Sequence, residues 1–273
     1  MSAGPRERLE RALARVARDQ GLDQERLRGW VSFLALCGVL ERSVNDGILT
    51  DYCLKGGVAM ELRFANAARA TKDLDLGLKG DRISRLASFE KAIQLGFDQF
   101  TFRVRPQTRH MELADTVRAQ VAIAYRSRGW QTIDVDLGPP GIESAELVNP
   151  AIRGLAEMGL PAIRGIRCIS LSEQVAQKLH ACTGPAAEGR ARDILDILLI
   201  EILGQLNYPK TRIAVFTERG THSLPTTFEI PATWRLELET LAHSLGSPIK
   251  NITEIAERFQ GVLTKIATNY SGT

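Results

Sequence analysis

Apolar residues recur at helical spacing near the start of the chain. In the first predicted helix they share one face, with arginine and glutamate on the other, and they are Leu9, Ala12, Leu13 and Val16. Gly21 interrupts the pattern, and Asp23 is a suitable N-cap for a second helix. The pattern therefore predicts two successive helices within residues 5–40.

The pattern changes to shorter runs after these helices. We expect a strand over residues 51–54, a helix over 58–64, an extended segment over 74–78 and an amphipathic helix over 83–95. Each run is short, and polar residues separate it from the next. This order is typical of a compact block in which helices and strands alternate.

Three β-like runs follow, over residues 99–104, 116–125 and 131–137. The tetrapeptide Arg126-Ser127-Arg128-Gly129 favours a hairpin turn between the last two runs. The tetrapeptide Gly138-Pro139-Pro140-Gly141 predicts the end of the sheet. Together these runs indicate a mixed sheet with helices packed on it.

The second half of the chain is predominantly helical. Residues 165–168 favour a short strand or a connector, and Ser170 resembles the cap of a helix that follows it. Further helices are expected over residues 190–203, 233–245 and 251–268.

The fold class predicted from this pattern is α+β. We expect N-terminal helices over residues 1–50 that pack on the core, an α/β domain over 51–150 and a helical C-terminal domain over 151–273.

Composition and charge narrow the class of protein only slightly. The net charge of +3 and the pI of about 8.7 neither demonstrate nor oppose a polyanionic ligand. We expect a cytoplasmic protein with no membrane partner, because no apolar run approaches a membrane span and the first residues lack the apolar core of a signal peptide. The cysteine and histidine spacings match no zinc motif, which argues against a metal site built from these residues.

The chemistry suggested by the sequence centres on two carboxylates. Asp73 and Asp75 flank Leu74 in a short extended run, so strand alternation directs both to one face. Like charges side by side repel each other. A divalent metal ion that carries a nucleoside triphosphate would offset this repulsion.

A glycine pair precedes these carboxylates. Gly56 and Gly57 follow Lys55 at the start of a predicted helix. Glycine lets the backbone approach a phosphate closely, and the first turn of a helix offers unpaired N–H donors. Lys55 either contacts a phosphate there or is an ordinary strand-end lysine with a solvated ammonium group.

A second acidic pair, Asp134 and Asp136, alternates with apolar residues in another strand. On its own this pair is typical of the polar outer face of a sheet. Beside Asp73 and Asp75, it would supply the third carboxylate that two-metal nucleotidyl transfer requires.

These residues carry a resemblance to a known family. The upstream residues read Lys55-Gly56-Gly57, then Arg69-x-Thr71-x-Asp73-x-Asp75. They resemble the nucleotidyltransferase motif of the DNA polymerase β superfamily and, more narrowly, the AbiEii/AbiGii toxin family. Downstream, that family's motifs are similar to Glu173-x-x-x-x-Lys178-Leu179-His180-Ala181 and Arg190-x-Arg192-Asp193-x-x-Asp196-Ile197. The resemblance covers about residues 52–200 and implies a polymerase β-like nucleotidyltransferase sheet with flanking helices, followed by a helical half.

The resemblance also implies roles for the residues near the upstream motif. Gly56 and Gly57 would hold the triphosphate, with Lys55 and Thr71 as polar neighbours. One departure is that the superfamily usually has Gly-Ser where this chain has Gly56-Gly57. The serine hydroxyl is therefore absent, and backbone donors would have to compensate.

The resemblance further assigns the acids and the lysine. Asp73 and Asp75 would bind Mg²⁺ in a two-ion site. Asp134 or Asp136 would be the third acid, or Asp193 would take a compensating part; we favour Asp134. Lys178 would stabilise the phosphates and Asp193 would be a further essential acid.

The implied activity is magnesium-dependent transfer of NMP from an NTP to an acceptor hydroxyl, with tRNA or another RNA as the acceptor. The implied role is the toxin of a bacterial toxin–antitoxin or phage-defence (abortive infection) system, with a cognate antitoxin encoded nearby. Three alternatives stay open: a small-molecule (aminoglycoside-type) nucleotidyltransferase, a nucleotide-binding module without turnover, and an interaction protein whose acidic pairs are surface features.

Overall fold

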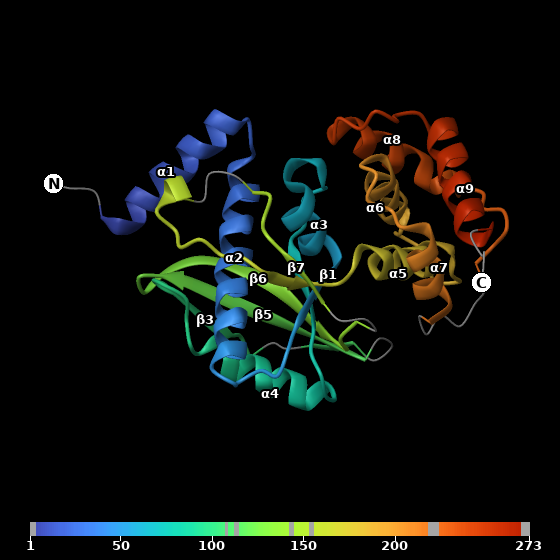
Figure 1. The fold of residues 1–273 in the computed structure, drawn as a ribbon. Helices are drawn as coiled ribbons and strands as arrows, with labels where there is room; N and C mark the ends of the chain where they lie inside the picture. Colours follow the sequence, from blue (N-terminus) through green and yellow to red (C-terminus); the bar gives the residue numbers. More distant parts are fainter. Residues whose placement is uncertain are drawn as a thin grey trace. The chain divides into compact units, whose positions relative to one another are not determined.

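The computed structural model describes residues 4–106, 109–111, 115–141, 145–152, 156–217 and 224–268. Contacts within the chain divide it into two compact units. The first contains the chain up to Ala65 together with Ala70–Gly141 and Ala145–Cys168, and the second contains Asn66–Arg69 and the chain from Ile169 onward (Figure 1). The proposed division into segments 1–50, 51–150 and 151–273 stays a prediction, since contacts alone do not establish which segment folds independently.

The first unit begins with the two predicted helices, α1 (Pro5–Gln20) and α2 (Gln24–Asn45). The Asp23 carboxylate accepts a hydrogen bond of 2.8 Å from the backbone N–H of Arg26, which confirms the predicted N-cap. The apolar face of α1 is buried against the rest of the unit, with Leu13 and Val16 almost fully covered. Hydrophobic periodicity was therefore sufficient to locate both helices.

The centre of the first unit is a mixed eight-stranded sheet in the order β3-β5-β6-β2-β1-β8-β7, with β4 paired to β5. Its strands are β1 (Cys53–Lys55), β2 (Asp73–Gly77), β3 (Phe100–Val104), β4 (Arg109–Met111), β5 (Thr116–Tyr125), β6 (Arg128–Gly138), β7 (Glu146–Val148) and β8 (Ile166–Cys168). β2 pairs parallel with β6 and antiparallel with β1, while β1 pairs parallel with β8. The mixed sheet predicted from the sequence is confirmed.

The prediction that residues 138–141 end the sheet is wrong. They end strand β6, but the chain returns to the same sheet as β7 and β8. The sequence pattern missed β4 and β7 and left β8 as a short strand or a connector, and each of these strands has three residues. Three residues are too few for alternation to be recognised, and pairing with neighbouring strands defines them instead.

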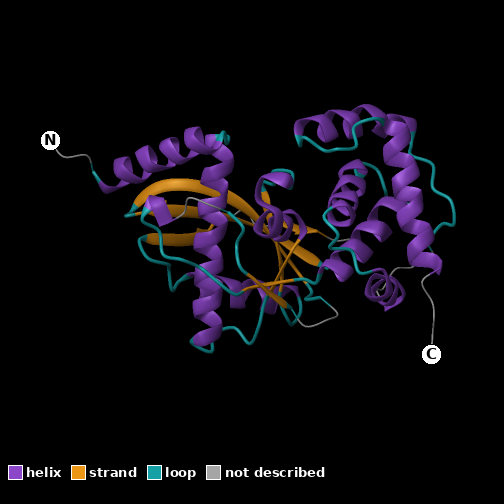
Figure 2. Cartoon of the chain, turned by 45° about the horizontal axis from the view of Figure 1, so that its top comes forward, coloured by secondary structure: helices purple, strands orange, loops and turns teal. Residues whose placement is uncertain are grey.

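Alternation along the central strands gives the sheet one apolar and one polar face. Buried side chains on one face include Leu74, Leu76, Val117, Val121, Ile123, Ile133, Val135 and Leu137. Helices α2 and α4 (Arg82–Ile93) contact the sheet and belong to the same hydrophobic core as these residues. Helix α2 crosses the sheet in both ribbon views (Figures 1 and 2). The polar side chains of β2, β5 and β6 are thus directed to the opposite face.

The predicted hairpin joins β5 to β6. Its two turn residues, Arg126 and Ser127, have φ of +48° and +62°, as in a type I′ turn. A bulge lies just beyond the turn, where the register shifts between Ile123 and Ala124 and leaves Trp130 as the extra residue on β6. The bulge sets which residues of the two strands lie opposite one another.

The second unit is helical. Its helices are α5 (Leu171–Thr183), α6 (Ala191–Ile202), α7 (Tyr208–Thr217), α8 (Arg235–Ser244) and α9 (Ile252–Thr268). The Ser170 hydroxyl accepts a hydrogen bond of 3.1 Å from the backbone N–H of Glu173, which confirms the predicted start of α5. Helix α5 packs on both α6 and α7.

The remaining elements of the described residues are α3 (Gly56–Phe64) and the short 3₁₀ turns Ala65–Ala67, Ala156–Met158 and Ala232–Trp234. Among the described residues, no helix combines the length and the apolar character needed to cross a bilayer.

Candidate active site

Four carboxylates meet on the polar face of the sheet. Parallel pairing of β2 with β6 puts Asp73 opposite Asp134 and Asp75 opposite Asp136. All four side chains are partly exposed, while the residues between them are buried. The sequence expectation of two acidic pairs, each on one face of its strand, is met, and the two strands are adjacent.

Two residues of β5 complete this face, and the sequence reasoning missed both. Arg118 lies opposite Asp136 and Gln120 lies opposite Asp134. The Arg118 guanidinium donates hydrogen bonds of 2.7 and 2.5 Å to the two carboxylate oxygens of Asp136, and Gln120 Nε2 donates one of 3.1 Å to Asp134. Their positions at alternate residues of a strand were the available signal, but the bulge makes the pairing hard to read from the sequence.

The Arg118 guanidinium offsets part of the repulsion among the carboxylates. Besides its bonds to Asp136, its Nη2 lies 3.9 Å from Asp73 Oδ2. Hydrogen bonding to Asp136 raises the pKa of Arg118 well above its ordinary value, so the cation is permanent. Asp136 is 12% exposed and Asp73 is 45% exposed, so Arg118 neutralises the more enclosed acid first.

Gly56 is required by a close approach of the Asp75 carboxylate. Its φ is +60°, and a Cβ atom at this position would lie 1.7 Å from Asp75 Oδ2. No side chain fits there, because helix α3 begins directly against the acid.

Gly57 is required by Thr71. A Cβ atom at Gly57 would lie 2.6 Å from Thr71 Cβ and 2.7 Å from Thr71 Oγ1. The Thr71 hydroxyl therefore occupies the space into which a serine at position 57 would project. It also donates a hydrogen bond of 2.8 Å to Asp73 Oδ1, which connects the glycine pair to the carboxylates.

Lys55 crosses the sheet rather than ending as a solvated strand-end side chain. Its Nζ donates a hydrogen bond of 2.6 Å to the backbone carbonyl of Pro139, just after β6. Its Cε would lie 2.9 Å from a Cβ atom at Gly77, so the aliphatic chain passes over that glycine. A role for Lys55 in binding a phosphate stays a prediction.

The donor set on this face consists of carboxylate oxygens, the ligands that Mg²⁺ prefers. Its members Asp73 and Asp134 lie directly opposite one another. Within the described ranges, however, no three acidic, histidine or cysteine side chains converge closely enough to hold an ion. The residues fit the metal in chemistry, and the two-ion arrangement stays a prediction.

The second unit contains a separate buried charge cluster around Lys178, here called the Lys178 cluster. Lys178 on α5 donates hydrogen bonds of 2.8 Å to Asp193 Oδ1 and 2.7 Å to Asp196 Oδ2 on α6. Arg69 Nε lies 3.3 Å from the same Asp196 oxygen, and an Arg190 nitrogen lies 3.6 Å from Asp193 Oδ2. Asp193 and Asp196 are three residues apart on α6, so both lie on the face of the helix that meets Lys178.

The carboxylates of Asp193 and Asp196 keep Lys178 protonated. Burial alone would lower its pKa, but the charges of Asp196 and Asp193 outweigh that effect and raise the pKa above its usual value. The ammonium ion is therefore present at neutral pH. Because the folded-state pKa is raised, the resulting stabilisation is fully present below about pH 10.4 and is lost only as the pH rises through the folded-state value.

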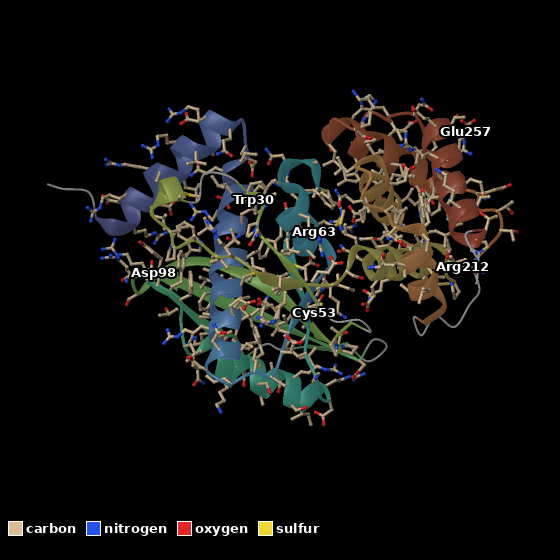
Figure 3. The ribbon with its side chains drawn as sticks, viewed as in Figure 1. Trp30, Cys53, Arg63, Asp98, Arg212 and Glu257 are labelled. Carbon is tan, nitrogen blue, oxygen red and sulfur yellow. The ribbon has the colours of Figure 1, made fainter. Side chains whose placement is uncertain are left out.

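The buried cysteine thiols are poorly suited to act as nucleophiles. All four are free and buried, including Cys53 at the start of β1 (Figure 3). Burial raises the pKa of Cys168 to about 12 and that of Cys182 to about 12. Neither thiol ionises near neutral pH, and the thiolate is the reactive form.

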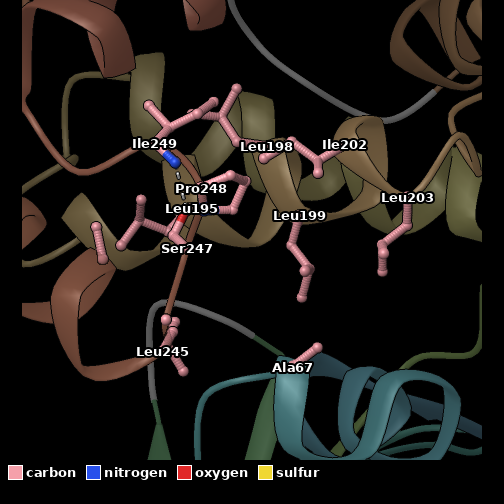
Figure 4. A pocket seen from close by; sticks show the side chains of 12 residues that line it. Ala67, Leu195, Leu198, Leu199, Ile202, Leu203, Leu245, Ser247, Pro248 and Ile249 are labelled. Atoms are coloured by element: carbon pink, nitrogen blue, oxygen red, sulfur yellow. Dashed lines mark hydrogen bonds between the residues drawn. The ribbon is translucent and has the colours of Figure 1, made fainter.

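The second unit also contains an apolar cavity of about 160 Å³, lined mainly by α6 and by residues 245–249 (Figure 4). Its lining is leucine-rich and includes Leu195, Leu198 and Ile202. The Ser247 hydroxyl in its wall accepts a hydrogen bond from the Ile249 backbone N–H. The lining contains no charged side chain, so the cavity is unsuited to a phosphorylated ligand.

The contact of Gly57 with Thr71 predicts the effect of a serine at position 57. Gly57→Ser should lower the free energy of unfolding by about 1–3 kcal/mol, because the added Cβ overlaps Thr71. Thr71→Gly removes the overlapping atoms, so the double variant should lose less than the sum of the single losses in urea denaturation. Gly29→Ser is the matched control, because a Cβ on that buried helical glycine meets only Phe33 Cε2 at 3.8 Å. Equal losses at positions 57 and 29 would contradict the overlap.

The Lys178 cluster predicts a large stability effect. Lys178→Met should lower the free energy of unfolding by about 3–5 kcal/mol, because it leaves two buried carboxylates without their shared cation. Adding Asp193→Asn and Asp196→Asn should recover part of the loss. Arg192→Gln, an exposed neighbour on α6, should change the free energy of unfolding by no more than about 0.5 kcal/mol. A Lys178 variant as stable as this control would show that the cluster is not a stabilising unit.

Comparison with known proteins identifies the family. The family model described as "Nucleotidyl transferase AbiEii toxin, Type IV TA system" matches residues 39–264. The match includes both motif regions and both charge clusters. A comparison with curated proteins found no match.

Solved structures support the fold. MenT4, a nucleotidyltransferase toxin from Mycobacterium tuberculosis, is 17% identical with a TM-score of 0.63, over 95% of this chain and 90% of that chain. ANT(2")-Ia in complex with adenylyl-2"-tobramycin is 17% identical over 70% of this chain and 99% of that one, with a TM-score of 0.42. An antigenic nucleotidyltransferase-like protein from Paracoccidioides brasiliensis is 15% identical over 79% and 94%, also with a TM-score of 0.42. At that level only MenT4 is informative about architecture, and with the family match it leads to one conclusion: the chain belongs to the AbiEii nucleotidyltransferase toxin family.

Proposed function

We propose that this family member is a magnesium-dependent enzyme that moves NMP from an NTP to a hydroxyl of an RNA acceptor such as tRNA. It acts in the cytoplasm, in a toxin–antitoxin or abortive-infection role, and a cognate antitoxin encoded nearby restrains it. The observation that carries the proposal is the register of β2 and β6, which sets Asp73 opposite Asp134 beside the glycine-rich start of α3.

The start of α3 suits the triphosphate. Gly56 and Gly57 form the first turn of the helix, where the absence of side chains lets the backbone lie close to a ligand. The positive end of the helix dipole at such a turn favours phosphate oxygens. The Thr71 hydroxyl, packed against Gly57, adds a polar group next to the same turn.

The carboxylates suit the metal and the acceptor. Asp73, Asp75 and Asp134 would hold Mg²⁺, which when bound supplies positive charge to the triphosphate and to the acceptor oxygen. The acceptor oxygen attacks the α-phosphorus, the bond from that phosphorus to the bridging oxygen breaks, and pyrophosphate leaves. The acceptor proton passes to Asp134 or to water beside it.

Asp134 is the better third acid, since Asp136 is already occupied by Arg118. Two short hydrogen bonds neutralise Asp136, whereas Asp134 accepts a single bond from the uncharged amide of Gln120. Asp134 also lies directly opposite Asp73. Its negative charge is therefore the more available of the two for a cation.

Lys178 and Asp193 take the roles that the family resemblance implies. Lys178 would stabilise negative charge on the phosphates, and its raised pKa supplies the protonated form that this role requires. Asp193 would act through Lys178, because the two are hydrogen bonded at 2.8 Å.

A cationic small-molecule acceptor is the second candidate. The observation that favours it is the row of four carboxylates on one sheet face, which attracts a cation. Arg118 offsets only part of this negative charge, through its ion pair with Asp136. An aminoglycoside in the same assay distinguishes the two acceptors.

Replacement of Asp73 predicts a selective loss of transfer. Asp73→Asn should lower transfer of labelled NMP to total tRNA by at least about 100-fold, the order expected when one electrostatic group is removed from a transition state. Its stability should change by no more than about 1 kcal/mol, because the side chain is 45% exposed. The assay contains each NTP in turn with Mg²⁺, and Asp98→Asn on the loop before β3 is the control. Full transfer by the Asp73 variant would sink the assignment, and label on an aminoglycoside alone would favour the second candidate.

The two acids of β6 should differ in effect. Asp134→Asn is expected to reduce transfer by about 100-fold or more, and Asp136→Asn by less than about 10-fold, since only the latter is already paired with Arg118. The measurement is the initial transfer rate as a function of Mg²⁺ concentration. The reverse order of effects would assign the third acid to Asp136.

A further inference from the structure

Four arginines form a continuous stripe on helix α1. Arg8, Arg11, Arg15 and Arg18 are separated by three, four and three residues, so they share one side of the helix. All four are exposed. The stripe is about 15 Å long at 1.5 Å rise per residue.

The stripe is not neutralised by ion pairs among the described residues. In the part of the chain that the structure describes, none of the four side chains forms an ion pair or a hydrogen bond. Of the nearby acids, Glu10 binds Arg28 of α2 at 2.6 Å, while the exposed Glu7 and Asp19, four residues from Arg11 and Arg15, form no ion pair with either. An arginine on a helix surface can pair with an acid three or four residues away, as the partly exposed Arg6 of the same helix does with Glu10 at 3.7 Å.

We propose that this arginine stripe binds the phosphate backbone of RNA. A planar guanidinium group matches phosphate geometry, and a row of them matches a regularly charged strand. At about 3.4 Å per phosphate along one strand, the stripe extends over about four phosphates. Helix α1 contains no aromatic residue on which a base could stack. The stripe is therefore expected to bind phosphates without selecting a base sequence.

A membrane surface fits these observations less well. An amphipathic helix binds a bilayer by inserting its apolar face among the lipids. That face of α1 is already used, because Leu9, Leu13 and Val16 are at most 3% exposed within the protein core.

The inference is independent of the family motifs. Helix α1 ends at Gln20, whereas the family model begins at residue 39. It rests on the proposed function only for the choice of RNA among polyanions. The residues involved lie outside the candidate active site, so RNA binding and nucleotidyl transfer can be tested separately.

The test is binding of fluorescein-labelled tRNA to the full chain, measured by fluorescence anisotropy without NTP or Mg²⁺ over a series of KCl concentrations. The stripe variant carries R8Q, R11Q, R15Q and R18Q, and glutamine keeps helix propensity high. The matched control carries R164Q, K210Q, R235Q and K250Q, four exposed residues whose loss changes the net charge equally. Circular dichroism checks that both variants are folded.

The stripe variant should bind tRNA on the order of 100-fold more weakly at 0.1 M KCl, and the slope of log K against log salt should fall by about 3, as for four lost phosphate contacts. The control should stay within about threefold of wild type. Equal losses in the two variants, or no loss in either, would overturn the proposal. A stripe that is needed for vesicles of phosphatidylserine but not for tRNA would overturn it in favour of a membrane. Mg²⁺-dependent binding of NTP by the stripe variant with the wild-type Kd would leave the enzyme assignment intact in every case.

Discussion

Parallel, in-register pairing of β2 with β6 brings two carboxylates opposite two others on one sheet face. The apolar residues between them must face α2 and α4, so the acids have no alternative but the other side. Their mutual repulsion then has to be offset by the remaining side chains of that face. Arg118 and Gln120 of β5 do this from the opposite strand, and Thr71 does it from the segment before β2. The polar face therefore follows from the packing of the apolar one.

The two charge clusters of the chain are balanced in different ways. Arg118 is 38% exposed, and a pair at such a site contributes little to stability and is open to exchange with other cations. Lys178 is 8% exposed, its two acids are as well buried, and any loss of one partner leaves a charge in a poorly solvated environment. The first arrangement suits a site that accepts and releases charged ligands. The second fixes α5 and α6 against each other and keeps Lys178 positively charged.

Much of this structure was readable in the sequence, and what was not has physical causes. Alternation alone assigned Asp73 and Asp75 to one face, and helical spacing alone brought Asp193 near Asp196. The pairing of Arg118 with Asp136 was not predicted, because the bulge at Trp130 shifts the register by one residue. Without that shift Arg118 would lie opposite Val135. Strands β4 and β7 were missed because each has three residues and is defined by its pairing, and for β8 the sequence left a connector open as the alternative. Local patterns predict which face of a strand or helix a side chain lies on, but they do not predict which residues of two paired strands lie opposite one another.

The contact of Gly57 with Thr71 has a consequence for the evolution of this family. The two positions share a single volume, which either side chain can fill but not both. A chain with serine at position 57 needs glycine at position 71 or a shift of the backbone between them, because the overlap includes Thr71 Cβ, and a chain with threonine at position 71 needs glycine at position 57. The hydroxyl beside the first turn of α3 can thus come either from a serine at position 57 or from the threonine at position 71. A serine at position 57 would then be tolerated only after position 71 has changed, so we expect substitutions at the two positions to occur together.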